Sequence, residues 1–591
     1  MKKPTIFFFS FFLLSISSQE NVKYQKPSKE ILDLVEFERP PSIVYDDNKN
    51  FMLFLFRDNY KSISELSAKE LRLGGLRIDP KTNIGSRVTY YNNVKIRNLK
   101  NQKSEITQVE GLPKNPKLSN ISWSPNQKRI ALTNTTETGV ELWVLELENG
   151  SVTKLTEPNL NSNIGSVINW FADSENMLVK MISNNRKSLI DTNQIVPDGP
   201  TISTNFGEKA QNRTYQDLLK NKFDEHNFEQ LSTSAIYKVS IDGSVKKWMD
   251  DGMYRTISFS PNGEYVMISQ INKPFSYLVT YSRFPTETNV YSKDGNFVSN
   301  LLNVPLIEEL PKGFMSARTG KRSFSWRPDK GASLTYVTAL DSGDPSKKVD
   351  FRDEVYELNY PFLGKGKFML KTINRFSGID WGTKDMAIAY DTWWNTRNRK
   401  SYVFNPSNPS IKPKIISDRN YQDTYSDPGV FLRSRNEFNR SVLKMHYGNV
   451  FLRGQGFSPN GQFPFIDKVN TKTFEKTRVY QSSYTDKIES IIDYDPKKNQ
   501  LTVSIESPSE YPNYYTKKIK SGKLEKITDL KNPFLELQNV KKKKITYLRK
   551  DGVELSGILY LPLNYDEEKK DKMPMILWAY PREFKDRKSA S

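Results

Sequence analysis

The sequence predicts a mainly β fold: a β-propeller of seven or eight four-stranded blades, followed by a second domain with a different pattern. Two observations predict the propeller, namely a turn phrase that recurs along most of the chain and the further hairpin that often follows it. A change of pattern after about residue 538 predicts the second domain. The expected division is therefore a signal peptide at residues 1–19, the propeller at 20–538 and the start of a second domain at 539–591.

The recurring phrase is an aromatic residue, a small or polar residue, often a proline, and then a polar turn that leads into a short apolar strand. Proline presets φ at the first corner of a turn, and Asn, Asp and Gly tolerate the conformations that the next positions need. We expect the aromatic residue to end an inner strand and to pack inward. The clear copies centre on Trp123, Phe259, Trp326 and Phe457, and the degenerate copies centre on Tyr45, Trp170, Trp381 and Tyr494.

A second hairpin follows several copies, as in the strand Glu141–Leu147, the turn at Asn149-Gly150 and the strand Ser151–Leu155. Each unit then has four strands, and the spacing of the copies is near or above the ~40–50 residues of a propeller blade. Closing such units into a ring protects most of the sheet edges. An array of β-sandwiches or a solenoid is the alternative. Within the longest gap between copies, Thr214–Asn221 is expected to be helical.

The composition excludes several classes of site. The chain has no cysteine and only two histidines, His226 and His446, so disulfides, thiol catalysis and a histidine-rich metal site are excluded, and no cofactor is expected. Lys and Arg number 88 against 68 Asp and Glu, which gives a net charge of +20. These charges are scattered, apart from Lys541–Lys544, and no nucleic-acid motif is present. A lysine-rich solvated surface is therefore favoured over nucleic-acid binding.

Residues 1–19 have the pattern of a secretory signal peptide. Lys2 and Lys3 give a basic start, Ile6–Ile16 is apolar, and Ser15–Ser18 supplies small residues near a cleavage site. The apolar stretch is too short for a stable membrane span, with an uncleaved N-terminal anchor as the alternative. We therefore expect an exported protein, periplasmic or extracellular, with no stable membrane span.

The C-terminal pattern predicts strands of another kind. Ile545–Lys550 is a strand, Asp551-Gly552 is a tight turn, and Val553–Leu561 is the return strand. Met575–Ala579 is an unbroken apolar run, typical of a buried strand in a parallel sheet. This order matches the opening of an α/β-hydrolase sheet, a domain that needs ~200 residues or more. Only residues 539–591 are available for it, so the sequence predicts the first strands of an incomplete α/β-hydrolase domain.

Several stretches taken together resemble the prolyl oligopeptidase family of serine peptidases, and most closely its glutamyl-endopeptidase-like branch. Three of them lie near the C-terminus: Tyr547–Leu555, Leu559–Pro562 and Met573–Phe584. The others are Arg213–Asn221, Arg322–Asp329 with Ala339–Pro345, and Gly378–Trp381 with Trp393–Arg397. The resemblance runs from about residue 25 to the last residue. It implies a propeller that caps a Ser-Asp-His hydrolase domain and selects peptides by size.

The resemblance also implies a role for Tyr580, which matches the tyrosine whose hydroxyl helps to form the oxyanion hole. A donor placed there stabilises negative charge only as the charge develops. The nucleophile is expected in a G-x-S-x-G turn, and the nearest approach to one, Gly331–Thr335, lacks the second glycine. No histidine follows His446, and both His226 and His446 are expected to be structural or surface residues. The serine, acid and base of the triad therefore have no candidates in this sequence.

The first functional hypothesis is an exported serine-type peptidase that hydrolyses peptide bonds through an acyl-enzyme, present here as a C-terminally truncated chain that is inactive alone. In an intact relative its partners would be peptide substrates. The alternative is a secreted propeller that binds a peptide, a glycan or a protein, although a dedicated binding protein has no use for hydrolase strands. A third hypothesis is complementation, in which a separate chain supplies the rest of the hydrolase domain.

Overall fold

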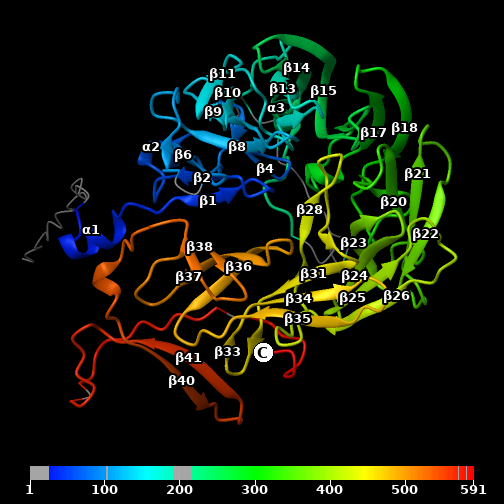
Figure 1. The fold of residues 1–591 in the computed structure, drawn as a ribbon. Helices are drawn as coiled ribbons and strands as arrows, with labels where there is room; N and C mark the ends of the chain where they lie inside the picture. The colour runs from blue at the N-terminus through cyan, green and yellow to red at the C-terminus, as the bar shows by residue number, and fades with distance from the viewer. Residues whose placement is uncertain are drawn as a thin grey trace, which may run out of the picture.

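The computed structural model describes residues 25–101, 104–191, 194, 196, 199, 207, 214–569, 571–580 and 582–590. The predicted signal peptide at residues 1–19 lies outside the described residues. Within these ranges no helix is both long enough and apolar enough to cross a membrane. The chain is mainly β, as the sequence predicts, and most of its strands belong to antiparallel sheets that follow one another in chain order (Figure 1).

The first four sheets, called sheets 1 to 4, come from the N-terminal half of the chain. Sheet 1 contains β1 (Ser42–Tyr45), β2 (Phe51–Phe56), β6 (Asn93–Asn98) and β7 (Thr107–Gln108), and sheet 2 contains β8 (Leu118–Trp123), β9 (Arg129–Thr135), β10 (Val140–Glu146) and β11 (Ser151–Lys154). Sheet 3 contains β12 (Ile168–Trp170), β13 (Asn176–Ile182), β14 (Ser234–Ser240) and β15 (Val245–Phe259), and sheet 4 continues through β15 with β16 (Tyr265–Ile271), β17 (Thr286–Ser292) and β18 (Phe297–Val304). The long strand β15 joins sheets 3 and 4 because its first half pairs with β14 and its second half pairs with β16.

The next four, sheets 5 to 8, complete the series. Sheet 5 contains β19 (Arg322–Trp326), β20 (Ser333–Ala339), β21 (Asp353–Asn359) and β22 (Lys367–Thr372), and sheet 6 contains β23 (Arg375–Thr383), β24 (Met386–Trp393), β25 (Asn398–Phe404) and β26 (Lys414–Asn420). Sheet 7 contains β27 (Val430–Phe431), β31 (Asn449–Gly454), β34 (Phe465–Asn470) and β35 (Lys476–Gln481), with β30 (Met445–His446) beside β31. Sheet 8 contains β36 (Ile488–Asp495), β37 (Gln500–Glu506), β38 (Asn513–Lys518) and β39 (Leu524–Lys526).

The sheets are arranged in a ring, from the blue sheet 1 through the green sheets to the orange sheet 8, which lies beside sheet 1 again (Figure 1). A buried hydrophobic cluster fills each interface between consecutive sheets from 1 to 8. Alternation along the strands makes this possible: Ile130 and Leu132 of β9 pack toward sheet 1, whereas Ala131 between them packs toward sheet 3. Sheets 2 to 7 therefore have a hydrophobic cluster on both faces, and sheets 1 and 8 have one on a single face; this packing stabilises the ring by about 25 cal/mol for each Å² of apolar surface buried.

Sheets 8 and 1 meet in a different way. Among the described residues no buried hydrophobic cluster joins them; instead the ring of Tyr45 meets that of Tyr514 edge-on, with centroids 5.9 Å apart. The Arg97 guanidinium donates a hydrogen bond to the carbonyl of Ile527. A cavity of about 1330 Å³ opens along this interface. The two ends of the series of sheets are thus joined by a more polar and looser contact than any other pair.

The recurring turn phrase lies where the sequence predicts it in seven of its eight copies. In these the aromatic residue stands at or near the end of the first strand of a sheet, as Tyr45, Trp123, Trp170, Phe259, Trp326, Trp381 and Tyr494 do. Two tryptophans also tie neighbouring sheets together: the indole N–H of Trp170 donates to the carbonyl of Ser122 at 3.2 Å, and that of Trp326 donates to the carbonyl of Ser258 at 3.0 Å. The phrase therefore joins a tight turn to a contact between sheets.

The eighth copy of the phrase is placed elsewhere, and the prediction for it is wrong. Phe457 lies in a small hairpin, β32 (Phe457–Ser458) and β33 (Gly461–Gln462), between the second and third strands of sheet 7. The first turn of that sheet is replaced by a longer hairpin, β28 (Arg433–Arg435) and β29 (Ser441–Leu443). A local turn signal cannot distinguish these positions, because both need the same backbone conformations.

The remaining elements are short or inserted. They are α1 (Lys29–Val35), α2 (Ile63–Ser67), β3 (Leu71–Leu73), β4 (Leu76–Asp79), β5 (Ile84–Gly85), α3 (Lys222–Ser232) and the 3₁₀ turns Tyr281–Arg283 and Leu535–Leu537. The expected helix at Thr214–Asn221 is wrong, because α3 begins only at Lys222. Asn221 caps it, since its side-chain oxygen accepts hydrogen bonds from the N–H groups of Phe223 and Asp224. Asp217, within the expected helix, has a left-handed φ of 59°.

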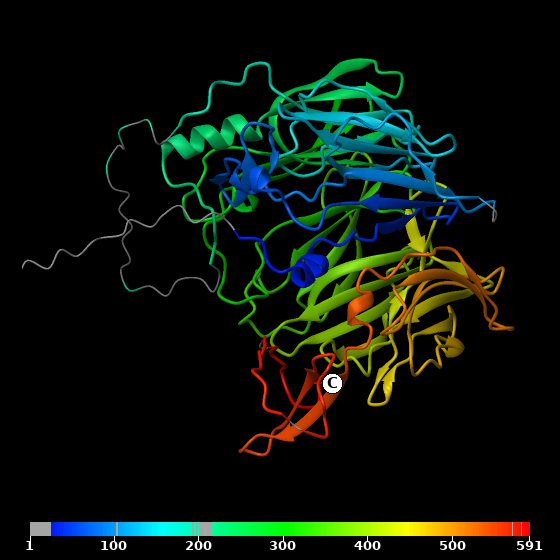
Figure 2. The same ribbon diagram turned by 90° about the vertical axis from the view of Figure 1, so that its left-hand side faces the viewer.

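The predicted C-terminal hairpin is present. Strands β40 (Lys542–Leu548) and β41 (Glu554–Tyr560) pair around the turn at Asp551-Gly552, and they form a separate two-stranded sheet. Both views show this hairpin at one edge of the molecule, outside the ring (Figures 1 and 2). Most of its side chains are exposed. The hairpin is therefore not a closing strand pair of any sheet in the ring.

The buried strand predicted at Met575–Ala579 is not formed. The segment is not assigned to a strand, and its side chains are exposed, with Ile576 at 96% and Trp578 at 83%. The physical reason is that no strand in the described part of the chain pairs with this segment, and no helix there covers it. An apolar run forms a buried strand only when neighbouring elements cover both of its faces.

We predict that the indole hydrogen bonds between sheets stabilise the ring. Trp170→Phe keeps most of the buried aromatic side chain but removes the N–H donor to the carbonyl of Ser122. It should therefore lower the free energy of unfolding by about 1 kcal/mol. Urea denaturation followed by fluorescence measures this change. Trp248→Phe is the matched control, because its indole donates to the carbonyl of Lys293 at an exposed position where water can replace the bond. An equal or larger loss of stability in the control contradicts the prediction.

Candidate functional site

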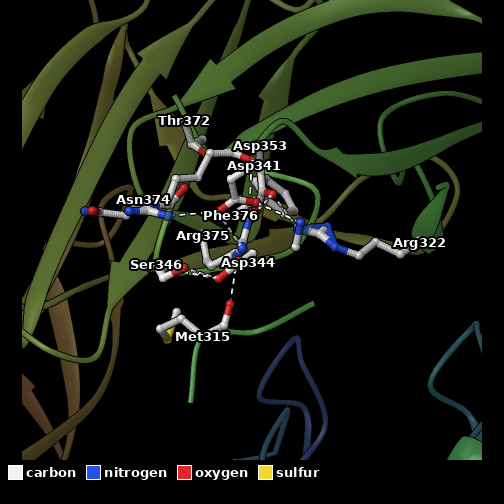
Figure 3. Close-up of polar contacts among 12 residues, drawn as sticks. Met315, Arg322, Asp341, Asp344, Ser346, Asp353, Thr372, Asn374, Arg375 and Phe376 are labelled. Atoms are coloured by element: carbon white, nitrogen blue, oxygen red, sulfur yellow. Dashed lines mark hydrogen bonds and ion pairs between the residues drawn. The ribbon is translucent and has the colours of Figure 1, made fainter. Parts of the chain in front are cut away.

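Two aspartates and three arginines form ion pairs at one end of sheets 5 and 6, and Figure 3 shows four of them, Arg322, Asp341, Asp353 and Arg375. Arg322, Asp353 and Arg375 are the first residues of β19, β21 and β23, so the antiparallel order of the strands brings them to the same end of the two sheets. Asp341 and Arg352 stand in the connection between β20 and β21. We call these five residues the arginine–aspartate cluster. It lies at the opposite end of the strands from the recurring aromatic turns.

Arg375 is the centre of the cluster, because it bridges both carboxylates. Its Nη2 is 2.8 Å from Asp341 Oδ2, and its Nη1 is 3.1 Å from Asp353 Oδ1. Each carboxylate has a second arginine: Arg352 lies 2.7 Å from Asp341, and Arg322 lies 2.6 Å from Asp353. The side chains of both aspartates are fully buried. A buried carboxylate is tolerated only when it is paired and hydrogen-bonded in this way.

Positive charge exceeds negative charge in the cluster. Three guanidinium groups face two carboxylates, and a fourth arginine, Arg318, stands nearby. Burial first, and then the charge of Arg322, lowers the pKa of Arg318 below its ordinary value. Such a lowering means that the surroundings disfavour a further positive charge. Burial is the larger cause of this lowering, and Asp344, whose pKa is lowered first by hydrogen bonds from Ser346 and less by the charge of Arg352, adds a third carboxylate beside the cluster.

Two tryptophans extend the cluster toward sheet 6. The guanidinium of Arg352 lies over the ring of Trp393 at 3.9 Å, and that of Arg397 lies over the ring of Trp394 at 3.7 Å. The ring of Phe314 packs against Trp394, with centroids 5.2 Å apart. Stacking of arginine on an aromatic face is favourable because the ring carries negative charge on its faces. These contacts fix the orientation of Arg397, whose side chain is only 6% exposed.

The C-terminal segment docks beside these tryptophans. Gln422 binds the backbone on both sides of Phe584: its Nε2 donates to the carbonyl of Glu583 at 2.7 Å, and its Oε1 accepts the N–H of Lys585 at 2.9 Å. Arg397 Nη2 is 3.5 Å from Glu583 Oε1. The segment that follows Tyr580 is therefore held on sheet 6 mainly through its backbone. The Glu583 side chain is largely exposed, so its ion pair adds little.

Tyr580, the predicted oxyanion donor, lies three positions before Glu583, and its side chain is 81% exposed. The two histidines occupy other places. His226 stands on α3, where its Nε2 is 2.9 Å from the carbonyl of Ser188, and the ring of His446 packs against that of Tyr447. In the described part of the chain, neither histidine is hydrogen-bonded to a serine hydroxyl, since the partner of His226 is the backbone carbonyl of Ser188. Their expected structural or surface role fits these contacts, whereas the role of Tyr580 stays a prediction.

Sequence reasoning found part of this site. Arg322, Asp341, Trp393 and Arg397 fall in stretches that carry the family resemblance, and the structure brings these separate stretches together. Sequence reasoning missed Arg375, Asp353 and Gln422. A charged residue at the first position of three alternate strands, β19, β21 and β23, was a signal that could have identified the cluster. Gln422 gave no signal, because it acts through a backbone contact with a segment distant in sequence.

Comparisons with known proteins agree with the resemblance. No family model matches the chain. Over 96% of its length the chain is 33% identical to a protein of Oryza sativa subsp. japonica named "Probable glutamyl endopeptidase, chloroplastic", and it is 31% identical over the same share to a protein of that name from Arabidopsis thaliana. The chain spans 63% of the rice relative and 62% of the Arabidopsis relative.

Solved structures of peptidases are also similar to the chain. Dipeptidyl peptidase 4 of Porphyromonas gingivalis aligns with 92% of this chain and 68% of its own at 10% identity, with a TM-score of 0.46. An acylaminoacyl peptidase of Pyrococcus horikoshii aligns with 90% of this chain and 58% of its own at 13% identity, with a TM-score of 0.38. Both TM-scores are below 0.5, so only the sequence relatives bear on the family likeness. They support the likeness to the glutamyl-endopeptidase-like branch of the prolyl oligopeptidase family.

We predict that Arg375 is needed to keep the two buried carboxylates paired. Arg375→Met should lower the free energy of unfolding by about 3 kcal/mol, because Asp341 and Asp353 each lose one of their two arginines in a buried setting. Thermal and urea unfolding measure the loss. Arg399→Met is the matched control: Arg399 is exposed, so its replacement should change stability by less than about 0.5 kcal/mol. Equal stability of the two variants contradicts this account of the cluster.

Proposed function

We propose that the chain is the propeller part of a serine peptidase of the prolyl oligopeptidase family, in its glutamyl-endopeptidase-like branch. In this proposal sheets 1 to 8 are the eight blades of the propeller. The hairpin β40–β41 and the segment Met573–Tyr580 are the first part of the hydrolase domain. The observation that carries the proposal is the similarity to two proteins named as glutamyl endopeptidases over 96% of the chain.

The position of the C-terminal hairpin supports this division. A closing strand pair would be paired to sheet 8 or sheet 1, whereas β40–β41 form a sheet of their own. The apolar side chains of this region are exposed, including those of Ile558, Trp578 and Tyr580. Large exposed apolar patches are typical of surfaces that another element covers. The element that fits is the remaining sheet and helices of a hydrolase domain.

The chemistry in the proposal is peptide-bond hydrolysis through an acyl-enzyme. The serine, acid and base would come from outside the 591 residues of this chain, and Tyr580 would donate to the oxyanion. Gln422 would hold the backbone of the segment after Tyr580 against sheet 6, so the ring would help to place the donor. Residues 1–19 support export of the protein, as the sequence predicts. Peptides are the substrates in this proposal.

The proposal predicts no catalysis by these residues alone. Purified residues 20–591 should neither hydrolyse fluorogenic peptides nor react with a fluorophosphonate probe, because no serine in them stands in a nucleophile turn. The predicted inactivity is contradicted by peptide hydrolysis that exceeds the buffer background and is abolished by serine reagents. Sequencing about 800 bases beyond the codon for Ser591 covers the ~200 residues still needed for a hydrolase domain. A G-x-S-x-G segment there supports the proposal, and a region with no catalytic remnant in any frame contradicts it.

The proposed boundary near residue 538 predicts a change in solubility. Ending the chain at residue 538 removes the exposed hairpin and the apolar segment, so the isolated ring should aggregate less. Light scattering and the soluble fraction after heating measure this change. Leu548→Thr with Ile558→Thr is the matched control, because it reduces the same exposed apolar surface within the full chain and should give a partial improvement. Unchanged or lower solubility of the shortened chain counts against the boundary.

A further inference from the structure

The hairpin β28–β29 occupies the middle of the ring in Figure 1. It takes the place of the aromatic turn that the other sheets have between their first and second strands, because it leaves β27 and returns to β31 within sheet 7. We call residues 432–444 the crossing hairpin. Its length exceeds what a connection inside one sheet needs. Its contacts with other sheets show what the additional residues do.

The base of the crossing hairpin is fixed to the two sheets that flank sheet 7. Arg433 forms an ion pair with Asp380 of β23 in sheet 6. Lys444 Nζ is 2.6 Å from Asp493 Oδ1 of β36 and 3.0 Å from the carbonyl of Tyr494, both in sheet 8. Leu432 and Leu443 are buried in the hydrophobic clusters on either side of sheet 7, and Val442 is buried in the cluster between sheets 5 and 6. The base is therefore part of the packed ring.

The tip reaches sheets on other sides of the ring. Arg440 Nη2 donates to the carbonyls of Phe259 and Ser260 at 3.0 Å each, in the aromatic turn of sheet 4. The side-chain amide of Asn436 donates to the carbonyl of Pro328 at 2.7 Å, in the aromatic turn of sheet 5. Arg435 forms an ion pair with Asp47, in the aromatic turn of sheet 1. The same hairpin therefore contacts the turns of three sheets that are not its neighbours.

The tip is also rigid. The Asn436 side-chain oxygen accepts the N–H groups of Phe438 at 3.1 Å and Arg440 at 2.9 Å, and the backbone of Asn436 bonds to those of Asn439 and Arg440. Burial lowers the pKa of Arg440 below its ordinary value, and the charge of Arg435 adds to this effect. A side chain that closes its own turn and also bonds to another sheet restricts both the tip and its position.

A cavity of about 260 Å³ lies between the tip and sheets 2, 3 and 4. Trp123, Trp170 and Ser258, from the first strands of these three sheets, are among its lining residues, and Phe438 and Arg440 of the tip complete it. The hairpin thus covers the ends of the first strands of sheets 2 to 4, while it bonds to the turns of sheets 1, 4 and 5.

From this geometry we propose that the crossing hairpin is a plug that closes the ring at the end of its aromatic turns. Chains and large solutes then cannot enter the ring through this end, so their route to its interior lies through the opposite end, where the arginine–aspartate cluster and the docked C-terminal segment lie, or through the cavity between sheets 8 and 1. This consequence for peptides rests on the proposed function, whereas the plug itself does not. In a peptidase, the plug closes this end of the ring to a substrate and so restricts the substrate's direction of approach.

The absence of cysteine from the sequence permits a direct test. Ser258→Cys places a single thiol in the cavity beneath the tip, and Ser244→Cys places one at an exposed turn of sheet 3 as the reference. With the native hairpin, Ser258→Cys should react with a 5-kDa polyethylene glycol maleimide at least about tenfold more slowly than Ser244→Cys, because reaction requires local opening. N-Ethylmaleimide should discriminate less between the two sites.

Releasing the tip should remove this protection. The triple variant combines three substitutions in the tip: Arg435→Ala, Asn436→Ala and Arg440→Ala. In the Ser258→Cys chain it should raise the rate of reaction with the large maleimide about tenfold, and in the Ser244→Cys chain it should leave that rate unchanged. Glu437→Ala is the matched control, since Glu437 lies on the same tip, is exposed and makes no hydrogen bond or ion pair in the described structure.

Two results would overturn the plug. One is equal reactivity of Ser258→Cys and Ser244→Cys toward the large maleimide with the native hairpin, and this comparison needs no tip variant to fold. The other is an unchanged rate at Ser258→Cys in a triple variant whose circular dichroism matches that of the parent. Labelling reports only on access, so the plug and the peptidase proposal can fail separately.

Discussion

The structure depends on one packing requirement: each sheet of the ring has a hydrophobic cluster on both faces, except where sheets 8 and 1 meet. We call the contact between sheets 8 and 1 the closing interface. Alternating side chains on a central strand supply both clusters, as Ile130, Ala131 and Leu132 do on β9. A sheet packed in this way cannot leave the ring without exposing two apolar faces. The aromatic turns strengthen the same contacts, because the indoles of Trp170 and Trp326 bond to the backbone of the preceding sheet.

The packing of whole sheets also explains the arginine–aspartate cluster. The strands β19, β21 and β23 begin at one end of sheets 5 and 6, and this end is where hydrophobic packing stops and buried charge begins. Asp341 and Asp353 hold Arg375 between the two sheets, and the neighbouring Gln422 holds the backbone of the C-terminal segment. The rigid ring thereby gives fixed positions to side chains that come from separate parts of the sequence. Preorganised side chains of this kind are what a functional site requires.

The sequence predicted the features that local chemistry controls and missed those that depend on distant partners. Turn residues and alternation located seven of the eight aromatic turns, and Asp551-Gly552 located the C-terminal hairpin. The helix was displaced because Asn221 favours the cap position over the helix interior. The prediction of a strand at Met575–Ala579 was wrong because an apolar run shows which residues could be buried. It does not show whether a neighbouring strand or helix is present to cover them. The bridging role of Arg375 depends on the packing of sheet 5 against sheet 6, which brings together Asp341, Asp353 and Arg375 from separate parts of the sequence.

Sheet 7, which contains the misplaced copy of the turn phrase at Phe457, also contributes to the closing interface. Sheet 7 uses its first turn position for the crossing hairpin, which bonds to sheet 8 through Lys444 and to sheet 1 through Arg435. These are the two sheets that no hydrophobic cluster joins among the described residues, and the hairpin lines the large cavity between them. Sheet 7 therefore bridges this interface with charged contacts. Such contacts weaken as salt screens them, whereas the seven hydrophobic interfaces do not, so the closing interface is the part of the ring whose stability should depend most on ionic strength.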